Sequence, residues 1–334
     1  MQIQLTLSSR FRGIAAIAAL GAALVATPVH AETSRTLKIG YILSTDSQLG
    51  AGAKAFADDL AKRTQGRLKV EQFPNSALGG EVEMLKGVQL GTVDLAFITG
   101  APLPNVLSEV GVFNIPFLFR DAKHAHAALD GPIGQEYLQK FRSKDMVALA
   151  WGENGMRHIT NSKREVRNPE DLKGMKLRLP QSEVMLMGFK ALGADVAPLA
   201  FPQLYGALQS GQFDGQENPI ATILSAKFAQ VQKHLTVSGH VYDPAVIVMS
   251  VDAFEELDEG DKEAIMAAAK IGGQASRAYA AEAQSKGVEA LRQAGMQVVT
   301  EIDSAKFAAA MAGAQPEFEK KFGADLISKI RASK

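Results

Sequence analysis

A short pattern, Gln-x-Gly-x-x-Asp, occurs twice in this sequence, at residues 89–94 and at residues 209–214. In each copy the glycine follows a predicted amphipathic helix, and the next predicted strand begins at or near the aspartate. Each copy lies late in a run of elements with the order β-α-β-α-β, which is typical of a parallel sheet with helices on its faces. The repeat therefore predicts two similar α/β lobes, and it falls well short of a solenoid period.

The two runs are predicted from the spacing of apolar residues and from capping signals. In the first run, strands are expected at residues 37–43, 68–73 and 93–98, with helices at 51–64 and 81–90. In the second run, a short capped helix is expected at 168–174, strands at 176–179 and around Val196, and helices at about 182–192 and 202–210.

Glycines shape the predictions for the segment between the two runs. Residues 147–151 are predicted to form a strand. Gly152 and Gly155 are expected to loosen the backbone after this strand. We therefore place Arg157 after a glycine-flanked turn.

The last third of the chain is expected to return to the first lobe. Strands are predicted at residues 235–237 and 246–250, and a mostly helical stretch at 261–294 with a bend or break at Gly272-Gly273. The C-terminal helices can then brace both lobes. The expected lobes are residues 32–152 with about 243–283, and residues 153–242 with about 284–334, joined by several crossings that act as a hinge.

The N-terminus has the pattern of a secretory signal peptide. Arg10 and Arg12 precede an uncharged run at residues 13–26, and residues 29–31 place small side chains at the two positions that a signal peptidase reads. The run is too short for a comfortable membrane span, although a retained membrane anchor is the alternative. We expect cleavage after Ala31 and, because the chain has no cysteine to form disulfides, a location in a bacterial periplasm.

Composition and motifs exclude several kinds of chemistry. The 36 basic residues balance the 36 acidic ones, so neither a nucleic-acid partner nor a polybasic membrane surface is indicated. The lack of cysteine excludes thiolate metal sites and cysteine nucleophiles, and no common hydrolase, zinc-protease or nucleotide-binding motif is complete. His124 and His126 are two apart in a predicted helix and so point to different faces. We predict no catalytic residue, no metal and no cofactor.

Polar residues gather in the second lobe at the ends of predicted elements. Arg178 ends a strand, Phe201 precedes a helix, and Asn218 comes just before another helix. In a parallel α/β lobe such strand ends meet along one edge. With Arg157 they would suit a carboxylate, because a guanidinium offers a planar fork that matches two oxygens. The alternative for Arg178 taken alone is a solvated strand edge.

Five motifs stand in order along the chain. They are Leu78-Gly-Gly-Glu81, Gln89-x-Gly-x-x-Asp94, Asn154-Gly-x-Arg157, Pro169-Glu-Asp-Leu-Lys-Gly-Met-Lys-Leu-Arg178 and Asp214-Gly-Gln-Glu-Asn-Pro219. With these motifs the sequence resembles the DctP-type family, the substrate-binding proteins of tripartite ATP-independent periplasmic (TRAP) transporters. The likeness covers nearly the whole chain after the signal peptide, and the last two motifs together are highly specific.

The resemblance implies a fold and a set of ligand contacts. The fold is α/β, a two-lobed periplasmic binding protein in which each lobe is a mixed sheet flanked by helices and a long C-terminal helix braces both lobes. By the same resemblance, Arg178 pairs with the carboxylate of an organic acid, Arg157 and Asn218 assist it, and Phe201 packs against the ligand.

The resemblance also implies contacts from the first lobe. These are Glu81, Thr99 and the loop near Ser44, and Gln181 is a further candidate in the second lobe. Relatives that bind sialic acid carry an arginine where this chain has Pro102 and an acid where it has Thr99. The departure disfavours sialic acid and leaves a smaller hydroxy, keto, sugar or dicarboxylic acid open.

Together these observations predict a monomeric, non-enzymatic binding protein. The expected partners are a small-molecule carboxylate and the small and large TRAP membrane subunits, which use an ion gradient rather than ATP. Two alternatives remain at this stage: a sensory binding protein that docks to a membrane receptor, and an exported lyase or hydrolase that acts on organic acids.

Overall fold

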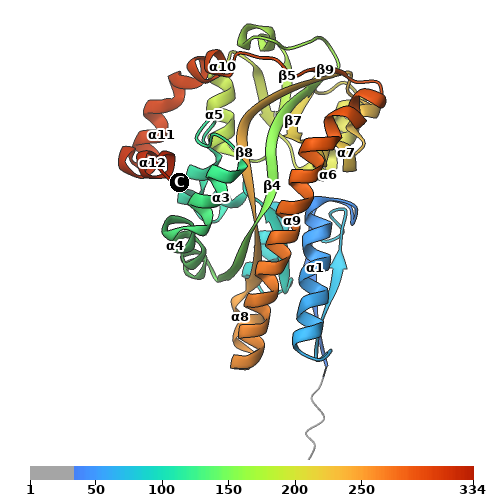
Figure 1. Ribbon diagram of the computed structural model, residues 1–334, viewed down its shortest axis with the longest axis vertical. Coiled ribbons are helices and arrows are strands. Elements are labelled where there is room, and N and C mark those ends of the chain that lie inside the picture. The colour runs from blue at the N-terminus through green and yellow to red at the C-terminus, as the bar shows by residue number, and fades with distance from the viewer. Residues whose placement is uncertain (1–33) are drawn as a thin grey trace, which may run out of the picture. The chain divides into compact units, whose positions relative to one another are not determined.

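The computed structural model describes residues 34–334, and the predicted signal peptide lies outside the described residues. The described residues form a mixed sheet of nine strands with helices packed against it (Figure 1). The strands lie in the order β2 (Leu68–Phe73), β1 (Arg35–Gly40), β3 (Leu95–Thr99), β8 (His234–Ser250), β4 (Met146–Asn161), β7 (Gly215–Pro219), β5 (Lys176–Leu179) and β6 (Asp195–Pro198), and β9 (Gln297–Val299) pairs with β8. The α/β class and the mixed sheet are as predicted, but the sheet is continuous across the two halves.

Two β-α-β-α-β units lie at the two ends of this sheet. The first unit is β1 (Arg35–Gly40), α1 (Gln48–Arg63), β2 (Leu68–Phe73), α2 (Glu81–Gln89) and β3 (Leu95–Thr99). The second unit is β5 (Lys176–Leu179), α5 (Glu183–Ala191), β6 (Asp195–Pro198), α6 (Phe201–Gln209) and β7 (Gly215–Pro219). Within each unit all pairings are parallel, with strand orders β2-β1-β3 and β6-β5-β7. The prediction of two similar parallel units is confirmed.

The repeated Gln-x-Gly-x-x-Asp pattern has the same physical role in both units. Its glycine has φ of 68° in one copy and 74° in the other, a left-handed backbone that ends the helix. Its aspartate connects the new strand to the neighbouring strand: Asp94 Oδ2 accepts a hydrogen bond from the Lys38 backbone N–H at 2.8 Å. Asp214 Oδ2 accepts the equivalent bond from Lys176 at 3.0 Å.

Two long antiparallel strands join the units. They are β4 (Met146–Asn161) and β8 (His234–Ser250), and they lie side by side in the middle of the sheet. The predicted loosening after residue 151 is therefore wrong, as is the predicted turn before Arg157. Gly155 (φ 129°) instead lies at a shift in register between β4 and β8, and β4 continues as one strand through this irregularity. The strands predicted at 235–237 and 246–250 are the two ends of β8.

One helix of 35 residues, α9 (Glu259–Gln293), runs along β4 and beside α1 (Figure 1). The predicted break at Gly272-Gly273 is wrong, because these glycines serve close packing. A Cβ on Gly272 would lie 2.8 Å from the Gly52 carbonyl oxygen in α1, and one on Gly273 would lie 2.2 Å from the Trp151 carbonyl oxygen in β4. Further along, Gly287 lets α9 approach the helix that follows β7.

We expect Gly273→Ala to lower the free energy of unfolding by about 1–3 kcal/mol, because the added methyl group overlaps the β4 backbone. The matched control is Gly206→Ala in α6, where a Cβ meets nothing within 4 Å. That variant should be neutral or more stable by about 0.5–1 kcal/mol, since alanine is the better helix former. Urea denaturation of both variants checks this, and equal effects would contradict the packing role.

The remaining elements cover the sheet and its ends. They are α3 (Ala122–Asp130), α4 (Pro132–Lys140), α7 (Ile220–Ser225), α8 (Val251–Glu255), β9 (Gln297–Val299), α10 (Ser304–Met311), α11 (Gln315–Phe322), α12 (Ala324–Arg331) and the 3-10 helices at Leu103–Asn105, Ser108–Asn114, Phe141–Lys144, Pro169–Leu172, Phe228–Gln230 and Ala312–Ala314. Between residues 34 and 334, no helix combines the length and the apolar character that crossing a bilayer requires.

Candidate functional site

A small cavity, with a volume of about 10 Å³, lies where the two units face each other. The volume has room for about one water molecule. Residues from both units and from β4 contribute to its wall. The lining residues are Ile42, Leu43, Glu81, Thr99, Asn154, Arg157, Arg178, Pro180, Phe201, Asn218 and Thr222.

The cavity brings together six of the eight site residues that the sequence predicts. Ser44 and Gln181 are not among the lining residues, although their neighbours Leu43 and Pro180 are. The Ser44 hydroxyl donates to the Asp46 carbonyl at 3.2 Å, and Gln181 is exposed.

Arg178 is buried in the wall of the cavity, with 2% of its surface exposed. The alternative of a solvated strand edge is therefore excluded. Its Nε donates to the Leu199 carbonyl oxygen at 2.8 Å. Among residues 34–334 no hydrogen bond is made by its two terminal amino groups. Burial, together with the nearby charge of Arg157, lowers the pKa of Arg178 to about 9. The guanidinium stays charged at neutral pH, and the attraction of Glu217 and Glu81 offsets the cost of its burial only in part.

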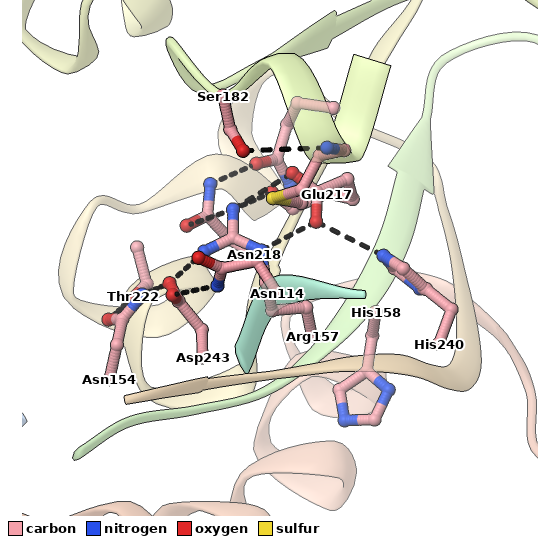
Figure 2. Close-up of polar contacts among 12 residues, drawn as sticks. Asn114, Asn154, Arg157, His158, Ser182, Glu217, Asn218, Thr222, His240 and Asp243 are labelled. Carbon is pink, nitrogen blue, oxygen red and sulfur yellow. Dashed lines mark hydrogen bonds and ion pairs between the residues drawn. The ribbon is translucent and has the colours of Figure 1, made fainter. Parts of the chain in front are cut away.

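Arg157, by contrast, is held by two carboxylates. Its Nε and Nη2 donate to the two oxygens of Glu217 at 2.6 and 2.8 Å, and its Nη1 donates to Asp243 at 2.6 Å. Figure 2 shows Asp243 on one side of the guanidinium and Glu217 on the other. Nη2 also bonds to the Glu217 backbone carbonyl and to Asn218 Oδ1, so only Nη1 keeps a hydrogen for another partner. These two carboxylates raise the pKa of Arg157.

Sheet register explains this grouping. Arg157 lies in β4, which pairs with β7 on one side and with β8 on the other. Glu217 comes from β7 and Asp243 from β8, so the three side chains meet across three adjacent strands. His240 Nε2, also from β8, lies 3.1 Å from Glu217.

Donors surround both carboxylates of this network. Asp243 accepts hydrogen bonds from Arg157, from Asn154 Nδ2 at 2.7 Å and from Asn114 Nδ2 at 3.1 Å. Burial raises the pKa of Asp243, whereas Arg157 and His240 outweigh burial and lower the pKa of Glu217. With both acids ionised, the charge of Arg157 is already matched inside the protein.

Glu81 belongs to the opposite wall of the cavity. It is the first residue of α2 and is 9% exposed. Its Oε1 accepts a hydrogen bond from the Thr99 backbone N–H at 2.7 Å. Burial outweighs this bond and raises the pKa of Glu81 to about 7. Glu81 can therefore be neutral or ionised near neutral pH.

Phe201 and Asn218 complete the predicted set. Phe201 is half-buried at the start of α6, and its ring lies 6.2 Å from that of Phe228. Asn218 ends in the cavity, where its Oδ1 accepts from Arg157 at 3.2 Å and its Nδ2 donates to Gln216. The Asn218 side chain is therefore held in a fixed orientation.

Sequence reasoning missed several residues of this site. Glu217 and Asn154 occur inside the quoted motifs but were not singled out, and Asp243, Thr222 and Gln48 were overlooked. Gln48 Nε2, from α1, donates to Thr222 Oγ1 at 2.9 Å and to Asn154 Oδ1 at 2.7 Å, and so links the first unit to α7 and β4. A signal existed for Asp243, since one acid within the apolar segment 241–249 indicates a buried partner of opposite charge.

The histidines have other partners. His124 Nε2 lies 3.0 Å from the Ile330 carbonyl oxygen, and His126 Nε2 lies 2.5 Å from Glu153. The two side chains thus face different elements, as predicted. Burial lowers the pKa of His158 to about 4 and also lowers the pKa of His240, so both are neutral at pH 7.

Comparison with known proteins gives a consistent result. Residues 39–321 match the family model described as bacterial extracellular solute-binding protein, family 7. The chain is 36% identical over 313 residues to the 2,3-diketo-L-gulonate-binding periplasmic protein YiaO of Escherichia coli, covering 92% of this chain and 95% of that protein.

Two solved structures are similar throughout. A TRAP periplasmic solute-binding protein from Bordetella bronchispeptica, with density assigned as pantoate, shares 47% identity at a TM-score of 0.89, covering 90% of this chain and 100% of that one. One from Polaromonas sp. JS666, bound to D-erythronate, also shares 47% identity at a TM-score of 0.89, covering 90% and 99%. This chain therefore belongs to the DctP-type family of solute-binding proteins that serve TRAP transporters, and it has their two-lobed fold.

Proposed function

We propose that this protein captures a small organic acid in the periplasm and delivers it to the membrane subunits of a TRAP transporter. The acid is bound without chemical change. Its carboxylate pairs with Arg178, and the two lobes close around it. A monomer suffices, since residues of a single chain line the cavity.

The observation that carries this proposal is the difference between the two buried arginines. Arg157 is matched by two carboxylates, whereas the terminal amino groups of Arg178 make no hydrogen bond to residues 34–334. A buried cation without a partner of opposite charge is costly, so an anion that enters the cavity is strongly favoured there. A carboxylate fits best because it accepts two parallel hydrogen bonds from the guanidinium fork.

The rest of the cavity favours a small, polar acid. Asn218 and Thr222 offer polar groups for hydroxyl or keto oxygens, and Phe201 offers an apolar face. The volume of about 10 Å³ is far below the range of about 300–1,000 Å³ that is usual for ligand pockets, so the two units must move apart to admit even a small acid. Relatives bind acids of this kind, D-erythronate and galactonate among them. Thr99 and Pro102 replace the residues expected for sialic acid.

We propose that the two lobes close around the ligand, because both units line a cavity with so little free space. The predicted lobe boundaries at 152/153, 242/243 and 283/284 fall inside β4, β8 and α9. These continuous elements would bend rather than swing as a free linker. The irregularity at Gly155 and the Gln48–Thr222 hydrogen bond lie where such bending would open and close the cavity.

A thermal-shift and calorimetric series tests the proposed function. The acids are D-erythronate, pantoate, succinate, galactonate and sialic acid, and erythritol serves as an uncharged match for erythronate. We expect one of the small acids to stabilise the protein by about 2.7 kcal/mol at a concentration one hundred times its Kd. Erythritol and sialic acid should not stabilise it. The proposal fails if no acid binds, or if erythritol binds as well as erythronate.

A further inference from the structure

Five charged side chains are buried around the cavity. They are Arg157, Arg178, Glu81, Glu217 and Asp243, each no more than 9% exposed. His158 and His240 lie close by but are neutral at pH 7. Two cations thus face three carboxyl groups, and the ligand carboxylate would be a fourth. All four carboxyl groups cannot remain ionised, because two cations do not balance four buried anions and burial keeps water away from them.

The hydrogen bonds show which of the carboxyl groups can carry a proton. All partners of Asp243 are donors, namely Arg157, Asn154 and Asn114. Glu217 accepts from Arg157 through both oxygens. A proton on either acid would displace one of these bonds and face another donor, so both acids hold a proton less readily than a carboxyl group with a free oxygen.

Glu81 is differently placed. Within residues 34–334 it pairs with no cation, and its hydrogen-bond partner is Thr99. The charged groups that act on it from neighbouring elements are Asp243 in β8 and Arg178 in β5, beyond which lie Arg157 and Glu217. Its own helix adds Glu83, which is exposed and caps the Gly80 backbone N–H. An anion bound at Arg178 would add a negative charge opposite Glu81 and remove the attraction that Arg178 exerts on it.

We infer that this protein binds a carboxylate together with one proton, which is held on Glu81 in the closed, liganded state. The inference rests on the proposed function and assigns a further role at the same site. A neutral Glu81 carboxyl can donate a hydrogen bond to a hydroxyl or keto oxygen of the ligand, which an ionised carboxylate cannot do. Opening of the lobes would then release the acid and the proton together.

The pH dependence has a definite sign. The pKa of Glu81 in the ligand-free closed form is raised to about 7, and the ligand anion raises this pKa further. Below this pH, Glu81 is already protonated, and affinity does not change with pH. Between this pKa and the higher pKa of the liganded form, binding must take up a proton, so affinity falls by about tenfold per pH unit.

Calorimetry of D-erythronate at about pH 8, in phosphate and in Tris buffer, measures this uptake directly. The two buffers differ in ionisation enthalpy, so each proton taken up changes the apparent binding enthalpy by a known amount. We expect close to one proton for the wild type and close to none for Glu81→Gln, whose amide mimics the neutral acid. Glu81→Gln should also bind with an affinity that does not depend on pH. The control is Glu71→Gln, an exposed acid of β2, which should behave as the wild type.

The possible results of this experiment distinguish the coupled proton from the binding function itself. Tight binding with equal enthalpy in both buffers would overturn the coupled proton while leaving the binding function intact. Proton uptake that persists in Glu81→Gln would place the proton on another group and also overturn the inference. If D-erythronate and the other acids do not bind the wild type at all, the proposed function fails and the inference fails with it.

Discussion

Replacing Arg178 with alanine is expected to weaken binding of a small organic acid by about 10²–10⁴-fold. The carboxylate loses two charge-assisted hydrogen bonds, worth about 1.5–3 kcal/mol each. The protein should remain folded, because Arg178 makes a single hydrogen bond within residues 34–334, to the Leu199 carbonyl. Calorimetric titration gives the change in Kd, and circular dichroism with urea denaturation checks the fold.

The matched control for this variant is Arg167→Ala. Arg167 is an arginine of the same half of the chain whose side chain is 57% exposed and pairs with Glu165 at the surface. Its loss should change neither Kd nor stability appreciably, since exposed pairs contribute about 0–1 kcal/mol. Arg178→Lys should also weaken binding, because an ammonium group cannot form the planar fork. Wild-type affinity in Arg178→Ala would contradict the proposed anchor.

The second large effect is expected at Arg157, and it is an effect on stability. Arg157→Met keeps much of the side-chain volume but leaves Glu217 and Asp243 buried without their shared cation. Breaking a buried ion pair from one side typically costs about 3–5 kcal/mol. We therefore expect a loss of this size in the free energy of unfolding at pH 7, measured by urea denaturation.

Arg292→Met provides the comparison for Arg157. Its side chain is 49% exposed and pairs with Glu289 on α9. That variant should lie within about 1 kcal/mol of the wild type. If Arg157→Met lowered the free energy of unfolding by equally little, Glu217 and Asp243 would not depend on Arg157 for their charge balance. The assignment of a structural role to Arg157 and a ligand-binding role to Arg178 would then be wrong.

The two arginines are expected to contribute differently to ligand binding. Arg157 lines the cavity but keeps one hydrogen, on Nη1, for a ligand, whereas Arg178 keeps both terminal amino groups. We therefore expect Arg157 to orient Asn218 and to hold three strands together more than to bind the acid. Arg178 is paired with no carboxylate of residues 34–334 and is therefore the expected partner of the ligand carboxylate.

Much of the fold could be predicted from local patterns. Strand β5 was predicted with the bounds it has, Lys176–Leu179, because its alternation is clear and Pro180 ends it. Asn168 occupies the N-cap position of the short helix before it, as its position ahead of a proline indicates, and its backbone N–H donates to Asp171. The repeated glycine and aspartate act through neighbours that lie close along the same unit. Local signals of this kind are visible in one sequence.

The long central strands could not be predicted in the same way. Most side chains of β4 and β8 are buried, so the alternation that marks a half-exposed strand is absent. Glycines in β4 look like a loop but form an irregularity, and Gly272-Gly273 look like a break but allow α1 and β4 to approach α9. In each case a distant contact decides the local conformation.

The site residues follow the same rule: those positioned by local signals could be predicted, and those positioned by distant contacts could not. The position of Arg178 followed from its strand and its motif. The partners of Arg157 did not, because Glu217 and Asp243 reach it only through the order of three strands that are far apart in sequence. The balance of charges around the cavity could therefore be inferred only from the order of the strands in the sheet.

The most direct test of the account is a crystal structure of this protein with a bound acid such as D-erythronate. We predict both carboxylate oxygens at about 2.7–2.9 Å from the terminal nitrogens of Arg178. Arg157 should still be bonded to Glu217 and Asp243. A carboxylate bound away from Arg178, or Arg178 paired with an acid of the protein while the ligand is in place, would contradict the central claim.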